Sequence, residues 1–236
     1  MGDALIYRRI AHRGAGALSP PGNTVDAVHL GLDAGADMVE VDVRATRDDV
    51  LVLEHNAFRP CQGRDIPLRD LPLAQWQQTA EEEQNALPLA TLEKVLAVVA
   101  QRGRGVLIDL KDNGIERLLA RLLRKVGIDP RTVMIAAPTN ASKVILRSLD
   151  PRLPIAHKVE PNEIEEFKPS IIDSLNTDGV YWPAKLITKE RVARLIKKEI
   201  IVYAGPASTA SEMRRLRDDC KVHGVVTDFP DILATI

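Results

Sequence analysis

Several residue types are scarce in this chain, and each scarcity narrows the class of protein. Only two of the 236 residues are cysteine, Cys61 and Cys220. They form no C-x-x-C pair, so the sequence predicts neither a thiolate metal site nor a disulfide framework. Aromatic residues make up 3% of the chain, and no apolar run approaches the roughly 18–20 residues that a membrane-spanning helix needs. We therefore expect no stable membrane insertion.

Neither sign of charge is in excess. The chain has 32 basic and 33 acidic residues, a formal net charge of -1. It lacks the basic patches of nucleic-acid-binding proteins, so we expect no nucleic acid as a partner. The first ten residues contain no apolar signal segment, which favours a cytoplasmic protein. No exposed apolar stripe decides the oligomeric state, and a homo-oligomer stays an open alternative.

Short β-branched runs alternate with longer amphipathic segments. The strand-like runs are Tyr7–Ala11, Met38–Val43, Val106–Leu110, Thr132–Ala136, Ile155–Lys158, Gly179–Tyr181, Ile200–Tyr203 and Gly224–Thr227. The helix-like segments are Thr24–Ala34, Leu89–Arg102, Ile115–Val126, Ser142–Leu149, Glu163–Leu175, Thr188–Lys198, Thr209–Asp218 and one from Pro230. This alternation predicts one α/β domain over residues 1–236, a (β/α)8 TIM barrel rather than an open doubly wound sheet.

One region interrupts the alternation after the second strand. A short extra strand, Val50–Leu53, precedes His55, and residues 56–88 are rich in Pro, Arg, Gln and Glu with only a weak helix near Leu71–Thr79. Long irregular segments in compact domains are usually functional. We therefore predict a loop insertion at 56–88 over the active-site mouth.

Three carboxylates follow or end predicted strands. Glu40 and Asp42 lie two residues apart on one strand and therefore point to the same side, and Asp109 lies at the end of the next barrel strand. In a TIM barrel such positions face the active-site end. Carboxylates that converge there repel one another unless a cation lies between them, so the pattern predicts a site for a hard divalent ion, Mg²⁺ or Ca²⁺.

Basic side chains accompany these carboxylates. Arg13 and Lys111 supply fixed positive charge suited to a phosphate group. His12 and His55 can act as proton donor and acceptor, because imidazole titrates near neutral pH. Each residue alone also has an ordinary structural role, and only their joint placement at one end of consecutive strands favours phosphodiester chemistry.

The other histidines are weaker candidates for site residues. His29 lies on the first predicted helix, at a packing or surface position. His157 ends a strand and could approach the site together with Lys158, which is a candidate for the substrate mouth. His223 precedes the last strand, at the end of a barrel that serves stability, so we interpret it as structural.

The order of the motifs resembles the glycerophosphodiester phosphodiesterase family. The matching segments are His12-Arg13-Gly14, Pro21-Gly22-Asn23-Thr24, 35–43, 50–55, 87–93, 107–111 and Gly224–Pro230. The resemblance implies a TIM barrel that hydrolyses glycerophosphodiesters to an alcohol and glycerol 3-phosphate with a divalent cation. It also implies His12 and His55 as acid and base, and a metal held by Glu40, Asp42 and Asp109. Arg13 and Lys111 would then contact the phosphate.

The chain departs from the family pattern at several positions. Gly22 replaces a glutamate of the P-E-N-T motif, Asp109 a glutamate, and Asn56 the aspartate after the second histidine. The aromatic residue at a late strand end becomes Tyr203, which we expect at the substrate mouth. Residues 56–88 are shorter than usual. Two alternatives stay open: a weak or inactive relative that binds a phosphorylated ligand, and a barrel phospholipase D-like enzyme that forms a cyclic phosphate.

Overall fold

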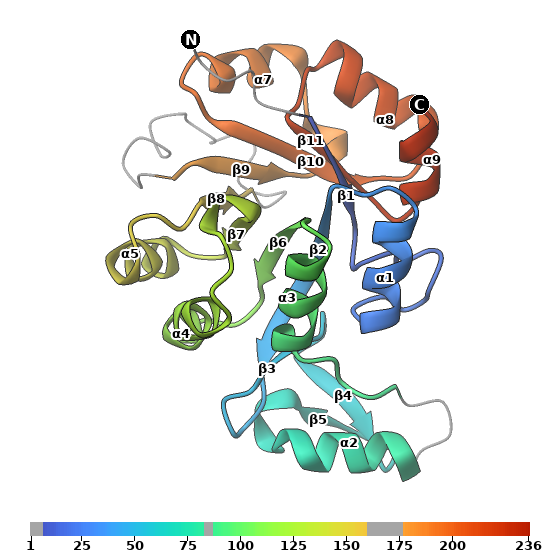
Figure 1. The fold of residues 1–236 in the computed structure, drawn as a ribbon, viewed down its shortest axis with the longest axis vertical. Helices are drawn as coiled ribbons and strands as arrows, with labels where there is room; N and C mark the ends of the chain where they lie inside the picture. Colours follow the sequence, from blue (N-terminus) through green and yellow to red (C-terminus); the bar gives the residue numbers. More distant parts are fainter. Residues whose placement is uncertain (1–6, 83–86, 160–176) are drawn as a thin grey trace.

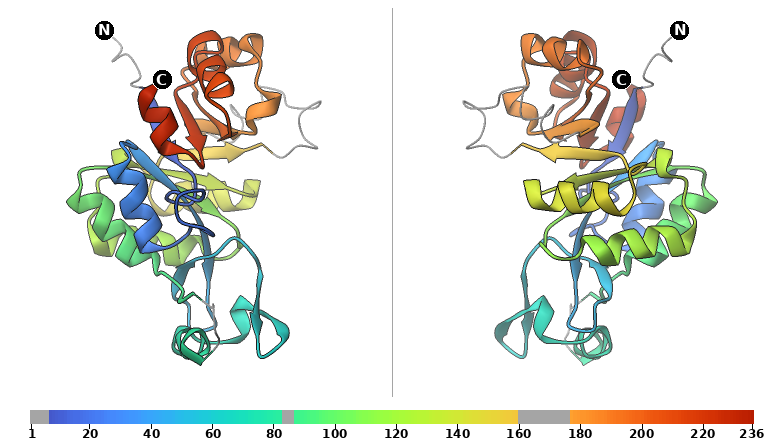
Figure 2. Two further views of the ribbon diagram at one scale, coloured as in Figure 1. Left: turned by 90° about the vertical axis from the view of Figure 1, so that its right-hand side faces the viewer. Right: turned by 90° about the vertical axis from the view of Figure 1, so that its left-hand side faces the viewer.

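The computed structural model describes residues 7–82, 87–159 and 177–236. Within them, eight parallel strands close into a barrel surrounded by helices (Figures 1 and 2). The strands are β1 (Arg8–Ala11), β2 (Met38–Ala45), β6 (Gly105–Leu110), β7 (Val133–Ala137), β8 (Ile155–Lys158), β9 (Gly179–Trp182), β10 (Ile201–Ala207) and β11 (Gly224–Thr227). Because β1 pairs in parallel with both β2 and β11, the barrel has no open edge there. The TIM-barrel prediction is confirmed.

Helices cover the outside of the barrel. They are α1 (Val25–Asp33), α3 (Leu92–Gln101), α4 (Glu116–Val126), α5 (Asn140–Leu149), α7 (Lys189–Ile196), α8 (Ala210–Arg214), which continues as a π-helical turn, and α9 (Pro230–Thr235). The segment Glu163–Leu175, predicted as a helix, lies outside the described residues. No described helix is long and apolar enough to cross a membrane.

Threonine side chains fix where many of these helices begin. In each case the hydroxyl accepts a hydrogen bond from the backbone N–H three residues later, which satisfies a donor that the helix itself leaves free. The capping residues are Thr24, Thr91, Thr139, Thr188 and Thr209. Each cap follows a barrel strand or the insertion after β3, so the caps set the points at which the chain turns back along the barrel.

Side chains alternate along each strand between two apolar cores, one between the barrel and its helices and one inside the barrel. Val39, Val41 and Val43 of β2 pack outward against helices. Met38 instead joins the cluster inside the barrel, with Ile10, Leu107, Met134 and Tyr203 among its members. Successive strand residues point to opposite faces, so Glu40 and Asp42 share the inward side with Met38. The apolar interior therefore gives way to carboxylates toward the carboxyl end of β2.

The region between β2 and α3 is more ordered than predicted. It begins with β3 (Leu51–Leu53), antiparallel to β2, and contains a hairpin of β4 (Phe58–Cys61) and β5 (Arg64–Pro67) followed by α2 (Leu73–Glu82). Trp76 anchors it: the side chain is buried among apolar neighbours and its Nε1 donates to the Leu68 carbonyl at 3.1 Å. The sequence signal for the hairpin is Gln62-Gly63, both at positive φ, the geometry that tight hairpin turns require.

Candidate active site

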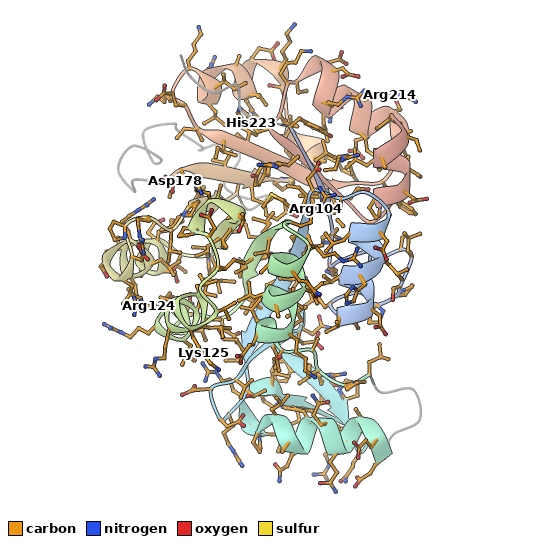
Figure 3. All side chains as sticks on the ribbon, in the orientation of Figure 1. Arg104, Arg124, Lys125, Asp178, Arg214 and His223 are labelled. Atoms are coloured by element: carbon orange, nitrogen blue, oxygen red, sulfur yellow. The ribbon has the colours of Figure 1, made fainter. Side chains whose placement is uncertain are left out.

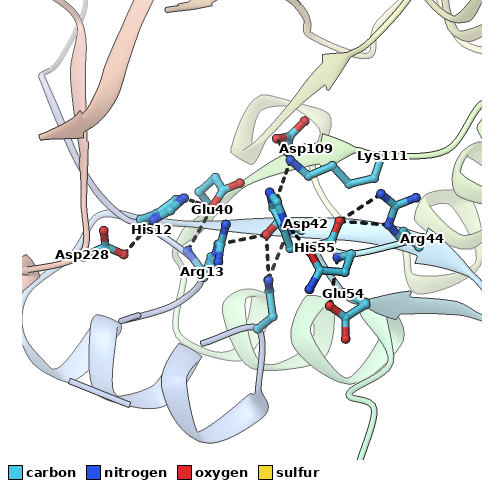
Figure 4. Close-up of polar contacts among 12 residues, drawn as sticks. His12, Arg13, Glu40, Asp42, Arg44, Glu54, His55, Asp109, Lys111 and Asp228 are labelled. Atoms are coloured by element: carbon cyan, nitrogen blue, oxygen red, sulfur yellow. Dashed lines mark hydrogen bonds and ion pairs between the residues drawn. The ribbon is translucent and has the colours of Figure 1, made fainter. Parts of the chain in front are cut away.

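Three carboxylates converge at the carboxyl ends of β2 and β6 (Figure 4). Glu40, Asp42 and Asp109 are each at most 3% exposed, and one oxygen from each lies within 4.8 Å of the others. Asp109 Oδ1 is buried and has no hydrogen-bond partner in the described part of the chain. A buried, unsatisfied acceptor beside two further carboxylates is a donor set that a hard cation fits. The cluster can therefore bind a metal ion.

Basic side chains lie against the same carboxylates. Lys111 Nζ lies 2.9 Å from Asp42 Oδ1 and 2.7 Å from Asp109 Oδ2. Lys158 Nζ lies 2.8 Å from Asp109 Oδ2, and Arg13 Nε lies 3.1 Å from Asp42 Oδ2. Burial lowers the pKa of Lys111, but the adjacent carboxylates of Asp109 and Asp42 raise it by more than burial lowers it. The net pKa of Lys111 therefore lies above its usual value. Lys111 therefore stays charged at neutral pH.

The third carboxylate, Glu40, has no ion pair with a lysine or arginine in the described part of the chain; its ion-pair contact is with His12. Burial raises the pKa of Glu40 to about 7; His12 lowers it, while Asp42 and Asp109 raise it further. Its Oε2 accepts a hydrogen bond from the Arg13 backbone N–H at 2.9 Å. The charged form of Glu40 thus lacks compensation, and a cation among the three carboxylates would supply it.

His12 is held by a carboxylate from the far end of the chain. Its Nδ1 lies 2.7 Å from Asp228 Oδ1, and its Nε2 lies 3.8 Å from Glu40 Oε2. Burial lowers the pKa of His12, but Glu40 and Asp228 outweigh burial and leave it above the usual value. Burial raises the pKa of Asp228 and the hydrogen bond from His12 lowers it, with a net decrease. An ionised carboxylate can only accept hydrogen bonds, so Asp228 accepts one from His12 Nδ1–H. This contact turns the Nε2 side of the His12 ring toward Glu40.

Asp228 and Asn23 were missed in the sequence. Asn23 Nδ2 donates to Asp42 Oδ2 at 2.8 Å, and the Asp42 N–H donates back to Asn23 Oδ1 at 3.1 Å. Both residues belong to motifs noted in the sequence, Pro21–Thr24 and Gly224–Pro230, and these motifs were the signals that could have identified them.

Gly22, next to Asn23, has a φ of +78°, and a Cβ there would lie 2.7 Å from the Cβ of Arg13. This backbone leaves no room for a side chain at position 22.

His55 reaches the site from the loop after β3. The side chain is exposed, and its Nδ1 lies 3.1 Å from Asn56 Oδ1. Arg44, near the end of β2, holds the His55 carbonyl oxygen through Nε at 3.1 Å and Nη2 at 2.9 Å. The same guanidinium is bound by Asp112, which also accepts the Ala45 N–H at 3.1 Å. The loop that carries His55 is therefore tied to the end of β2.

The mouth above these groups is a cavity of about 290 Å³. Glu40 lies beneath it, and the structure brings the predicted catalytic, phosphate-binding and metal-binding residues together at one opening. The residues that line the cavity include His12, Arg13, Asp42, His55, Asp109, Lys111, Lys158 and Tyr181. Lys158, a candidate for the substrate mouth, is among these lining residues.

The expectation for Tyr203 is wrong. Tyr203 is the third residue of β10, which runs from Ile201 to Ala207, and it lines a cavity at the opposite end of the barrel. Tyr181 of β9 lies at the mouth instead.

The histidines with the weaker sequence evidence lie away from the mouth. His157 turns outward, where its Nδ1 contacts Lys143 of α5. His223 accepts a hydrogen bond from the Val202 N–H at 2.8 Å, in agreement with a structural interpretation.

Comparisons with known proteins identify the family of this chain. The family model described as "Glycerophosphoryl diester phosphodiesterase family" matches residues 12–232. A glycerophosphodiester phosphodiesterase of Bacillus altitudinis is 26% identical over 94% of both chains. One from Caldanaerobacter subterraneus is 23% identical over 96% of both.

Solved structures share the fold at lower sequence identity. An Oleispira antarctica phosphodiesterase, solved with the product sn-glycerol-3-phosphate, has a TM-score of 0.83 and 21% identity over 98% of this chain and 97% of its own. A glycerophosphodiester phosphodiesterase of Thermotoga maritima has a TM-score of 0.81 and 19% identity over 97% of both chains. The match of the family model over nearly the whole chain decides the assignment: this chain belongs to the glycerophosphoryl diester phosphodiesterase family and is a phosphoric diester hydrolase.

Proposed function

We propose that this chain hydrolyses glycerophosphodiesters to an alcohol and glycerol 3-phosphate, with His12 and His55 as proton donor and acceptor. The observation that carries the proposal is the convergence of both histidines on one opening above three buried carboxylates. The Oleispira antarctica relative with sn-glycerol-3-phosphate as its product supports the choice of substrate class.

In this proposal Glu40, Asp42 and Asp109 hold a divalent cation, Mg²⁺ or Ca²⁺. Such an ion, when bound, polarises a phosphoryl oxygen and neutralises developing negative charge. The buried, unpartnered Asp109 Oδ1 and the raised pKa of Glu40 support this assignment. Arg13 and Lys111 line the same opening and bind the phosphate oxygens as fixed positive charges.

His12 is the proton donor to the leaving alcohol. Its Nδ1–H is bonded to Asp228, so the proton available for transfer is on Nε2. A pKa above the usual value keeps this ring protonated over more of the neutral range. When the bond between phosphorus and the alcohol oxygen breaks, that oxygen takes the Nε2 proton and leaves as the neutral alcohol.

His55 is the proton acceptor from the attacking water. An amide oxygen can only accept a hydrogen bond, so the contact with Asn56 Oδ1 places the His55 proton on Nδ1 and leaves a lone pair on Nε2. Asn56 thus serves the orienting role that the family's aspartate would serve. The water oxygen bonds to phosphorus as its proton passes to His55. Proton exchange with solvent then returns a proton to His12 and removes one from His55, which restores the starting states.

The proposal is tested with a panel of glycerophosphodiesters incubated with Mg²⁺, Mn²⁺ or Ca²⁺, and with a chelator. We expect release of glycerol 3-phosphate that the chelator abolishes. Release of no phosphomonoester from any substrate with any ion would contradict hydrolysis and favour a relative that only binds a phosphorylated ligand. Accumulation of a cyclic phosphate would instead show attack by a substrate hydroxyl.

A further inference from the structure

A second cavity lies at the end of the barrel opposite the active site. Its volume is about 640 Å³. The wall includes the first residue of several strands: Arg8, Met38, Gly105, Val133 and Ile201. The apolar interior of the barrel, with Ile10 and Leu107 in its core, separates this cavity from the carboxylates at the other end.

Positive charge dominates this cavity. Arg8, Arg104 and Arg131 line it, and Asp37 is the one carboxylate in the lining. Figure 3 marks Arg104, just before β6, and His223, just before β11. Asp37 is already held by Arg9, which approaches it through Nε and Nη2 at 3.0 Å. Arg104 lies 3.5 Å from the same carboxylate, so Asp37 cannot neutralise the arginines of the wall.

Arg8 points into the barrel and lacks an ion-pair partner among the described residues. It alternates with Ile10, which faces the interior, so the two share the inward side of β1. Burial raises the pKa of Tyr203 to about 12, and the charge of Arg8 lowers it, which agrees with a guanidinium close to that ring. An inward guanidinium without a carboxylate partner is available to pair with a bound anion.

His223 adds a neutral donor. Its Nδ1 accepts the Val202 N–H at 2.8 Å, and burial lowers its pKa, so the ring is neutral with its proton on Nε2. The floor of the cavity is apolar, with Met38, Met134 and Tyr203. A phosphate group would meet the arginines and the Nε2–H, and a small organic substituent would lie on the apolar floor.

We propose that this cavity is a second ligand site, selective for phosphomonoester dianions such as phosphorylated alcohols or sugars. After Asp37 and Asp129 are matched with their arginine partners, about two positive charges remain on the wall, which suits a dianion better than a phosphodiester monoanion. The site does not depend on the proposed function. Its occupant is the enzyme's own phosphomonoester product or another metabolite of that chemistry.

The test is calorimetric titration of the full chain with glycerol 3-phosphate, inorganic phosphate and dimethyl phosphate. The double variant R13A/K111A removes phosphate contacts at the mouth, and R8Q/R104Q removes them at the second cavity. R121Q, an exposed arginine on α4, is the matched control. We expect R13A/K111A and R121Q to keep a phosphomonoester site that R8Q/R104Q weakens tenfold or more, since each charge-assisted bond contributes substantially.

Turnover of R8Q/R104Q should stay within about twofold of the parent. Hydrogen exchange on the parent gives a second measurement, independent of variant folding: glycerol 3-phosphate should protect amides at the starts of β1, β2 and β10. Binding that disappears in R13A/K111A and is unchanged in R8Q/R104Q would overturn the proposal. Equal affinity for dimethyl phosphate would overturn the selectivity for dianions.

Discussion

Asp42 and Asp109 are register partners on adjacent parallel strands, β2 and β6. Strands in a sheet lie about 4.8 Å apart, so this pairing alone brings two inward carboxylates side by side. Lys111 continues the inward side of β6 by two residues and bridges both of them. The backbone register of the barrel, rather than a loop conformation, therefore builds the centre of the site.

The hydrogen bond between Asp228 and His12 gives the first prediction. His12→Ala should lower turnover about 10²–10⁴-fold, the usual range for acid–base catalysis, and Asp228→Asn at least tenfold. Both losses should be much smaller for a substrate with a p-nitrophenolate leaving group, which departs without a proton. The measurement is kcat on the two substrates, with Asp231→Asn on the exposed side of α9 as the control. Equal losses on both substrates would contradict proton donation by His12.

Gly22 gives a prediction about stability. Gly22→Ala should lower the free energy of unfolding by about 1–3 kcal/mol, because the new Cβ meets both a positive φ and Arg13. Gly63→Ala is the control: its φ is +73° but no atom lies near the new Cβ, so it carries only the conformational cost. Denaturant unfolding measures both. Equal costs would show that the backbone around Arg13 moves freely to admit a side chain.

Arg44 should act on turnover through His55. Arg44→Met releases the His55 carbonyl and should lower kcat about tenfold with little change in KM, whereas Arg47→Met, at an exposed neighbour, should change neither. A loss of stability alone could mimic this effect. A double-mutant cycle separates the two, because Arg44→Met should cause no further loss in a His55→Ala background. Additive losses would show that Arg44 does not act through His55.

The pair of Asp37 and Arg9 should make stability depend on pH. Burial raises the pKa of Asp37, but hydrogen bonds from Arg9 lower it, and the net pKa is below its ordinary 3.8. A carboxyl with a lowered pKa stabilises the fold above its unfolded-state pKa and loses that contribution as the pH falls through the folded value. Asp37→Asn should therefore cost about 1–3 kcal/mol at pH 7, and the difference from the parent should shrink below about pH 4.

Denaturant midpoints between pH 7 and pH 3.5 measure this dependence. The control is Asp33→Asn, which breaks a surface pair with Arg102 and should cost at most about 1 kcal/mol. A gap between parent and Asp37→Asn that stays constant down to pH 3.5 would contradict the role given to the ion pair.

The presence of short, nearly continuous β-branched runs was enough to predict all eight barrel strands, because both faces of each strand are buried. It was not enough for β10. The sequence prediction ended this strand at Tyr203. The strand in fact continues to Ala207. A residue at the end of its strand would lie at the mouth, whereas Tyr203 pairs with Gly224, the first residue of β11, and lines the cavity at the other end of the barrel.

The site residues that follow strands were predictable for the same reason as the fold. Asp228 was not, because it is more than two hundred residues from His12 and nothing local connects them. The closed barrel makes the connection: Ala11 pairs with Thr227, so the next residue on each strand, His12 and Asp228, must be neighbours. Asn23 depended on a turn at positive φ, which sequence periodicity does not encode.

The pairing of β1 with β11 also sets when the enzyme becomes competent during synthesis. His12 is translated well before Asp228, which follows it by 216 residues. Until β11 is in place, the His12 ring has no carboxylate to fix its tautomer, however well the first strands have folded. Phosphodiesterase activity in a growing chain should therefore report closure of the barrel. Nascent chains should show no activity until β11 is added.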